Sequence, residues 1–169
     1  MGTVYWITGL SGAGKTTIGK LLYEKIRVEH VNTVFLDGDV LRKVFGDDLG
    51  YSKEDRRKCA MRYARLCAML QEQDMNVICC TISMFDSVRE WNRENICNYK
   101  EIYVKASMET LLVRDQKGLY SGVTEEKQKE VAGVHMEIEE PKNPDFVLYN
   151  DGQWTPEELV REILQKSVV

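Results

Sequence analysis

The sequence predicts an α/β fold of the phosphate-loop, nucleoside-triphosphate-binding class, with a five-stranded parallel sheet and helices on both faces. Short β-branched apolar runs alternate with segments of helical periodicity along the chain. Most of these runs are continuously apolar, which is typical of parallel strands that are covered on both faces. The glycine-rich stretch "GLSGAGKTT" separates the first run from the first helical segment. The 169 residues are enough for one domain, 1–169.

The predicted elements follow one another in a regular order. The strands are the runs "TVYWIT", "TVFLD", "NVICCTI", "EIYVKA" and "DFVLYN", at 3–8, 33–37, 76–82, 101–106 and 145–150. The helices are expected near 14–28, 53–72, 86–97, 107–114 and 155–166. Strand–helix alternation implies right-handed crossovers in an open sheet. Ligands of such sheets bind at the carboxyl ends of the strands, so functional residues are expected directly after each strand.

Composition narrows the class of protein. The formal net charge of −4 disfavours nucleic acid as a partner. No apolar run approaches the roughly 18 residues of a membrane span, and the start "MGTVYWITG" resembles a buried strand rather than a signal peptide. The five cysteines show no metal-binding spacing. We expect reduced, mostly buried thiols in a cytoplasmic protein without a membrane partner.

The stretch from Gly9 to Thr16 matches the phosphate-loop pattern G-x-x-x-x-G-K-[ST] in full, after a strand and before a helix. Its glycines let backbone N–H groups surround a phosphate, and the helix N-terminus adds its positive end. We expect Lys15 to reach the β- and γ-phosphates of ATP and Thr16 to hold Mg²⁺. The alternative is a glycine-rich turn with a chance lysine. The predicted cofactor-binding residues here are Gly9, Ser11, Gly12, Ala13, Gly14, Lys15, Thr16 and Thr17.

Two carboxylates close the second strand in "FLDGDVLR". Asp37 and Asp39 are two residues apart, so both side chains can face the same cleft. One carboxylate could orient hydrated magnesium, and the other could accept the proton of an attacking hydroxyl. An ordinary Asp-Gly turn is the alternative. The position after the second strand of a phosphate-loop protein favours function.

Basic residues follow in "YSKEDRRKCAMRYAR". A solvated helix face explains most charge runs, and Arg57, Lys58 and Arg65 are assigned to it. Arg42 and Arg56 are candidates for a clamp on an anionic substrate. The third strand ends at Ser83, where many nucleotide-hydrolysing motors place an acidic residue.

The segment "RDQKGLY" at 114–120 has Arg and Lys around a glycine. That composition favours a mobile lid, about 115–140, that closes over the phosphates. A plain surface loop is the alternative for this segment.

Together these motifs resemble those of adenylyl-sulfate kinases, which transfer phosphate from MgATP to the ribose 3′-hydroxyl of adenylyl sulfate. The resemblance rests on "GLSGAGKTT", "LDGDVLR", "LGYSKEDR", "YVKA", "RDQKGLY" and "EEPKNPDFVL", which occur in the family's order almost from end to end. It implies ATP and Mg²⁺ as cofactors and a homodimer as the assembly.

The resemblance also implies roles for single residues. Asp37 with Thr16 would place magnesium, Asp39 would meet the acceptor hydroxyl, and Ser83 would lie near the transferred phosphate. Lys15, Asp37, Asp39 and Ser83 are thus the catalytic candidates, and Arg114 and Lys117 belong to the nucleotide lid. The implied substrate-binding residues are Asp39, Arg42, Tyr51, Arg56, Ile82, Ser83, Phe85, Lys117, Leu119 and Val131.

Several residues depart from the family's pattern on the acceptor side. Met84 replaces a usual proline, Asp86 a frequent arginine, and Cys59 an acceptor-side asparagine. Val131 replaces the phenylalanine of "FTGID", which stacks on the substrate adenine opposite the Tyr51 position. A ligand-facing His135 is less expected than an incidental one. These departures leave room for a branch of the family that phosphorylates cytidine diphosphoramidate.

The leading prediction is a kinase that acts on adenylyl sulfate, with cytidine diphosphoramidate or another small nucleotide as the alternative acceptor. A non-catalytic nucleotide-binding module is a further alternative, but the joint presence of Lys15, Thr16, Asp37 and Asp39 argues against it. A nucleoside-monophosphate or sugar-acid kinase of the same fold is disfavoured by "LDGDVLR" and "RDQKGLY".

Overall fold

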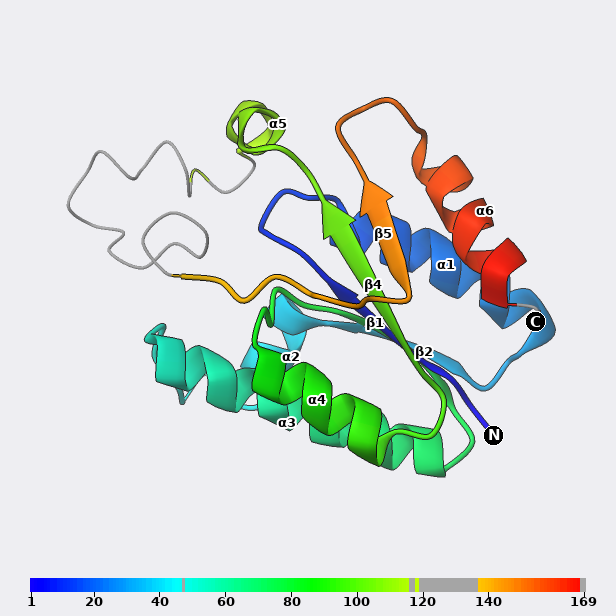
Figure 1. Ribbon diagram of the computed structural model, residues 1–169. Helices are drawn as coiled ribbons and strands as arrows, with labels where there is room; N and C mark the ends of the chain where they lie inside the picture. Colours follow the sequence, from blue (N-terminus) through cyan, green and yellow to red (C-terminus); the bar gives the residue numbers. More distant parts are fainter. Residues whose placement is uncertain (47, 116–117, 119–136, 168–169) are drawn as a thin grey trace.

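The computed structural model describes residues 1–46, 48–115, 118 and 137–167. The predicted α/β fold is confirmed: a parallel sheet has the strand order β2-β3-β1-β4-β5 (Figure 1). The parallel pairings place β1 in the centre of the sheet, between β3 and β4. The strands are β1 (Val4–Thr8), β2 (Thr33–Asp37), β3 (Asn76–Cys80), β4 (Tyr99–Lys105) and β5 (Phe146–Tyr149).

Each predicted helix is present, with small shifts at its ends. The helices are α1 (Lys15–Glu29), α2 (Gly38–Val44), α3 (Lys53–Glu72), α4 (Asp86–Asn95), α5 (Met108–Arg114) and α6 (Pro156–Ser167). Helix α2 was not predicted. It has 7 residues, begins at a glycine and buries only Leu41, so neither propensity nor periodicity reveals it.

The helices form two layers around the sheet. Helices α1 and α6 lie on one face, and α2, α3 and α4 lie on the other (Figure 1). Side chains of β1 alternate accordingly: Tyr5 and Ile7 join the core under α1 and α6, whereas Val4 and Trp6 join the core under α3 and α4. All five residues of β1 are buried. Because both faces of this strand are covered, its sequence does not alternate between apolar and polar residues.

Within the described part of the chain, no helix has the length and apolar character that a bilayer crossing requires. All five cysteines are free thiols. Cys59, Cys67, Cys79 and Cys80 are buried and Cys97 is exposed, which confirms the expectation of mostly buried thiols.

Candidate active site

The phosphate loop leaves the central strand β1 and leads into α1. Gly14 has a φ of 102°, and a Cβ at this position would collide with the side-chain amide of Asn150. A Cβ on Gly9 would collide with the carbonyl oxygen of Val104 on β4. Asn150 Nδ2 donates a hydrogen bond to the Ala13 carbonyl oxygen over 2.8 Å. The loop is therefore fixed from behind by the strands next to it.

Lys15 follows Gly14 of the phosphate loop and is the first residue of α1. Its Nζ donates to the Leu10 carbonyl oxygen over 2.7 Å, so the side chain folds back across the loop. The Cys80 thiol donates to the Lys15 carbonyl oxygen over 3.3 Å. Burial raises the pKa of this thiol to about 12, so the thiol stays protonated and keeps its role as a donor. The first turn of α1 is thereby attached to the end of β3.

Asp37, the last residue of β2, connects the loop to helix α2. Its Oδ2 accepts a hydrogen bond from Thr16 Oγ1 over 3.0 Å. Its Oδ1 accepts one from the Asp39 backbone N–H over 3.0 Å, which makes Asp37 the N-cap of α2. A hydroxyl and a carboxylate thus meet beside Lys15. These hard oxygen groups suit Mg²⁺, which prefers oxygen ligands and retains several waters.

Asp39 lies in the first turn of α2 rather than at the strand end, where it was expected. The two carboxylates nevertheless line the same cavity, as predicted. The cap explains this, because Asp37 turns the chain into α2 and brings Asp39 back over the strand ends. An ordinary Asp-Gly turn, the alternative considered above, is absent at this position because residues 38–44 are helical.

One cavity of about 520 Å³ unites most of the predicted site. It opens at the carboxyl ends of β1, β2 and β3, the edge where a parallel sheet places its ligands. The predicted residues that line it are Ser11, Gly12, Gly14, Lys15, Thr16, Thr17, Asp37, Asp39, Arg42, Tyr51, Arg56, Ile82, Ser83 and Phe85. Ala13 is fully buried and, like Gly9, supports the loop without lining the cavity.

Arg42, Tyr51 and Arg56 form a cationic wall of this cavity, and we call these three residues the arginine wall. Two guanidinium groups lie over the Tyr51 ring, with Arg42 Cζ 4.1 Å and Arg56 Cζ 5.3 Å from its centroid. Arg42 Nη2 donates to the Gly50 carbonyl oxygen over 2.6 Å, and Arg56 Nε donates to the Tyr51 carbonyl oxygen over 2.9 Å. Arg57, assigned to the solvated helix face, does not line the cavity and pairs with Glu54 on the exposed side of α3.

Ser83 follows β3 with an unusual backbone. Its φ is 30°, a value that residues other than glycine rarely adopt. The Ser83 hydroxyl lies 2.6 Å from the Thr81 hydroxyl, and both side chains are buried. Strained backbone of this kind concentrates at functional sites.

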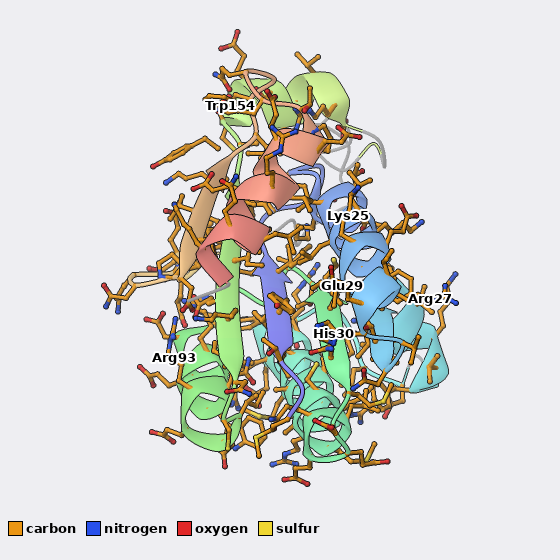
Figure 2. All side chains as sticks on the ribbon, turned by 90° about the vertical axis from the view of Figure 1, so that its right-hand side faces the viewer. Lys25, Arg27, Glu29, His30, Arg93 and Trp154 are labelled. Atoms are coloured by element: carbon orange, nitrogen blue, oxygen red, sulfur yellow. The ribbon has the colours of Figure 1, made fainter. Side chains whose placement is uncertain are left out.

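A second cavity, of about 310 Å³, lies on the other side of the phosphate loop. It shares Gly12, Gly14 and Thr17 with the first cavity. Arg114, predicted as a lid residue, lines this cavity and not the first one, and so does Trp154. Figure 2 shows Trp154 beside the N-terminal end of α6 and far from His30 at the end of α1.

Some predicted site residues lie outside the described part of the chain. These are Lys117, Leu119, Val131 and the unassigned His135, with most of the predicted lid at 115–140. Conversely, sequence reasoning missed several residues that line the first cavity. Among them are Cys59 and Tyr63 on α3, Cys80 at the end of β3 with Thr81 directly after it, and Glu137 and Ile138 before β5. Departures from the family's pattern at Cys59 and at Met84, which also lines the cavity, were the signals available, because the other missed residues carry no motif.

Comparisons with known proteins agree with this geometry. The family model described as adenylylsulphate kinase matches residues 1–149. A cytidine diphosphoramidate kinase of Campylobacter jejuni is 40% identical over 163 residues, which covers 96% of this chain and 95% of that protein. An adenylyl-sulfate kinase of Halothermothrix orenii is 34% identical over 97% of this chain and 88% of that protein.

Solved structures show the same relationship. The Mycobacterium tuberculosis APS kinase in complex with AMPPNP and APS has a TM-score of 0.86 and 28% identity, over 97% of this chain and 96% of that one. A gluconokinase from Sinorhizobium meliloti, with 17% identity and a TM-score of 0.62, shares the fold alone. The family match over most of the chain and the site built on one phosphate loop lead to one conclusion: the chain belongs to the adenylyl-sulfate kinase family and is a kinase.

Proposed function

We propose that the protein transfers the γ-phosphoryl group of ATP to the ribose 3′-hydroxyl of a small anionic nucleotide. The first candidate acceptor is adenylyl sulfate, which would give 3′-phosphoadenylyl sulfate and ADP. The observation that carries the proposal is the gathering of transfer and acceptor groups in one cavity. These groups are Lys15, Thr16, Asp37, Asp39, Arg42 and Arg56.

The transfer step follows from where these groups lie. ATP phosphates on the backbone N–H groups of the loop have the Lys15 ammonium beside them, and this charge acts most strongly on the transition state. The Asp39 carboxylate accepts the proton of the acceptor hydroxyl. The hydroxyl oxygen then bonds to the γ-phosphorus as the bond to the β-phosphate oxygen breaks, and ADP leaves with that electron pair.

Thr16 and Asp37 are the residues that would hold Mg²⁺. The 3.0 Å hydrogen bond between Thr16 Oγ1 and Asp37 Oδ2 brings their oxygens together beside the loop. The ion, when bound, neutralises charge on the β- and γ-phosphates. Asp37 also caps α2, so the same carboxylate orients the helix that bears Asp39.

The second cavity is the proposed place of the donor nucleoside. It adjoins the first across the loop, so a triphosphate that crosses the loop would lead from one to the other. Arg114 and Trp154 there offer a guanidinium plane and an indole for a base to stack on. The Arg114 Nη1 donates to the Gly12 carbonyl oxygen over 3.5 Å, which holds the side chain close to the loop.

Cytidine diphosphoramidate is the second candidate acceptor. The 40% identical relative from Campylobacter jejuni carries this name, whereas the adenylyl-sulfate kinase of Halothermothrix orenii is 34% identical. Cys59 and Met84, two departures from the family's acceptor side, both line the cavity. The arginine wall suits either acceptor, because both carry an anionic group on the 5′ side of the ribose.

The deciding experiment is a parallel turnover assay with MgATP and each acceptor. We expect ADP release that depends on the acceptor, with phosphate found on the ribose 3′-oxygen by phosphorus NMR. The kcat/KM ratio for the two nucleotides assigns the acceptor. ATP binding without turnover of either nucleotide would indicate the non-catalytic module instead.

We propose that the protein forms a homodimer, as the family resemblance implies, and that it is cytoplasmic, as its free and mostly buried thiols favour. Light scattering at several protein concentrations measures the oligomeric state. A monomer at every concentration would contradict the proposed homodimer.

A further inference from the structure

Residues 137–140 form the end of the predicted lid and border the first cavity, although none of them was a predicted site residue. Glu137 and Ile138 line the cavity. The Glu139 backbone N–H donates to the Met84 carbonyl oxygen over 3.2 Å. Arg89 Nη2 donates to the Glu139 carbonyl oxygen over 2.6 Å. Hydrogen bonds on both sides of its backbone therefore hold this segment against the connection from β3 to α4.

The Glu139 side chain adds two further attachments. Its Oε2 accepts a hydrogen bond from the Asp86 backbone N–H, 2.6 Å away, at the start of α4. Its Oε1 lies 3.7 Å from Lys53 Nζ at the start of α3. Glu139 thus joins the segment to the beginnings of both helices that border the cavity. The position of Glu137, two residues earlier, follows from these contacts.

Glu137 differs from the other carboxylates of the cavity. Asp37 uses one oxygen for Thr16 and the other for the Asp39 backbone N–H. For Glu137, no hydrogen bond or ion pair occurs with any residue that the structure describes. The Glu137 side chain is exposed, so water satisfies its carboxylate when the cavity is empty. An ionised carboxylate is a hydrogen-bond acceptor only, so a ligand in the cavity that replaces this water would present an N–H or O–H group to it.

The surroundings of Glu137 indicate which part of the ligand this is. The cations Arg42, Lys43 and Arg56 belong to α2 and α3 and suit the anionic part of the acceptor. The segment with Glu137 instead contacts the loop of Met84 and Phe85, whose buried side chains line the cavity with apolar surface. A planar base fits apolar surface, and a carboxylate beside it meets the polar edge of that base.

We propose that Glu137 accepts a hydrogen bond from the exocyclic amine of the acceptor's base. The site then selects bases with an amine, adenine or cytosine, over their keto counterparts, hypoxanthine and uracil, whose oxygen would face the carboxylate. This inference rests on the proposed function and deepens it, because it defines the class of acceptor by one chemical group. Both candidate acceptors, adenylyl sulfate and cytidine diphosphoramidate, carry such an amine.

The test compares kcat/KM for matched acceptors in wild type and variants. The pairs are adenylyl sulfate with inosinyl sulfate, and cytidine with uridine diphosphoramidate. Wild type should prefer the amine of the active pair by about tenfold to a hundredfold, the factor that a hydrogen bond to a charged group supplies. Glu137→Ala should reduce this preference to less than about threefold. Glu137→Gln should shift it toward the keto base, because a side-chain amide can also donate.

Glu140→Gln is the matched control. Glu140 belongs to the same segment, but its carboxylate pairs with Lys105 at 3.0 Å, and the side chain does not line the cavity. The same loss of charge there should leave the preference unchanged. An equal preference in wild type and Glu137→Ala, or an equal change in Glu140→Gln, would overturn the inference while leaving the kinase proposal intact.

Turnover of none of these acceptors would contradict the proposed function instead. Binding then decides on Glu137, with AMP against IMP and CMP against UMP measured by calorimetry. A preference for the amine that disappears in Glu137→Ala supports the inference. Equal affinities in wild type overturn it.

Discussion

The donor side and the acceptor side of the first cavity are built in different ways. The phosphate loop is shaped by backbone and glycine, with Ala13 buried and its carbonyl held by Asn150. The arginine wall consists of side chains: the guanidinium groups lie over the Tyr51 ring and donate hydrogen bonds to loop carbonyl oxygens, and Tyr51 is 57% exposed. A binding site shaped by the backbone keeps its geometry when most neighbouring side chains are replaced. A binding site made of side chains changes its shape and charge with each replacement. One family can therefore keep its donor and vary its acceptor.

Asp39→Asn should have the largest effect on turnover, because Asp39 lies where the donor side and the acceptor side of the cavity meet. The amide keeps the shape but cannot accept the hydroxyl proton, so we expect kcat to fall by about 10²- to 10⁴-fold. ATP affinity, measured by calorimetry, should change little. A collapse of ATP affinity would instead place Asp39 in the metal site and transfer the base role elsewhere.

Lys15→Ala tests the donor side alone. Loss of one preorganised charge at the transferred phosphate should lower kcat/KM by about 10²- to 10³-fold. The loss should be equal for every acceptor, because Lys15 belongs to the donor side, which is the same whichever acceptor is bound. Circular dichroism should show an unchanged fold. A loss of less than about tenfold would show that the ammonium does not act on the transition state.

Glu139→Ala tests the acceptor side by removing contacts that hold residues 137–140 in place. Removal of the hydrogen bond to the Asp86 N–H and of the Lys53 pair should raise KM for the acceptor by about tenfold, with little change in kcat. KM for ATP should stay within about twofold, since the loop is fixed separately. Glu139→Gln keeps an oxygen for the Asp86 N–H and should recover most of the loss. Equal rises of both KM values would mean a general loss of structure.

Val131→Phe should have the smallest effect and concerns a residue outside the described part of the chain. If adenylyl sulfate is the acceptor, the ring should restore a stacking partner and lower its KM by about two- to twelvefold. If the acceptor has a smaller base, the added ring should overfill the site and acceptor efficiency should fall. ATP affinity serves as the control in both cases. The measurement is kcat/KM for both acceptors, in wild type and variant.

The sequence was sufficient for the regular parts of the molecule. Apolar, β-branched runs predicted all five strands. The pattern is clearest in β1, β3 and β4, which are largely buried on both faces and have no polar side to obscure it. The phosphate loop was predictable because its residues are adjacent in the chain. Helix α2 was missed because 7 residues with one buried side chain leave no period to detect.

The missed part of the site has a different cause. Glu137 and Trp154 line the two cavities only because of the tertiary fold. The attachment of residues 137–140 to α4 brings Glu137 to the first cavity. The turn after β5 brings Trp154 to the second cavity. Neither position carries a local signature, so their proximity to the loop depends on long-range packing. Sequence patterns thus predict sites made from one segment better than sites made from several.

The hydrogen bond from Asn150 to Ala13 also has a consequence for the order of folding. It spans 137 positions in sequence, and β1 cannot complete its pairing before β3 and β4 exist. Parallel sheets with such distant partners form late and slowly. During synthesis the loop is made first but acquires its final support only when Asn150 has left the ribosome. A nascent chain that stops before that residue should bind ATP poorly, so that nucleotide binding would report the completion of the fold.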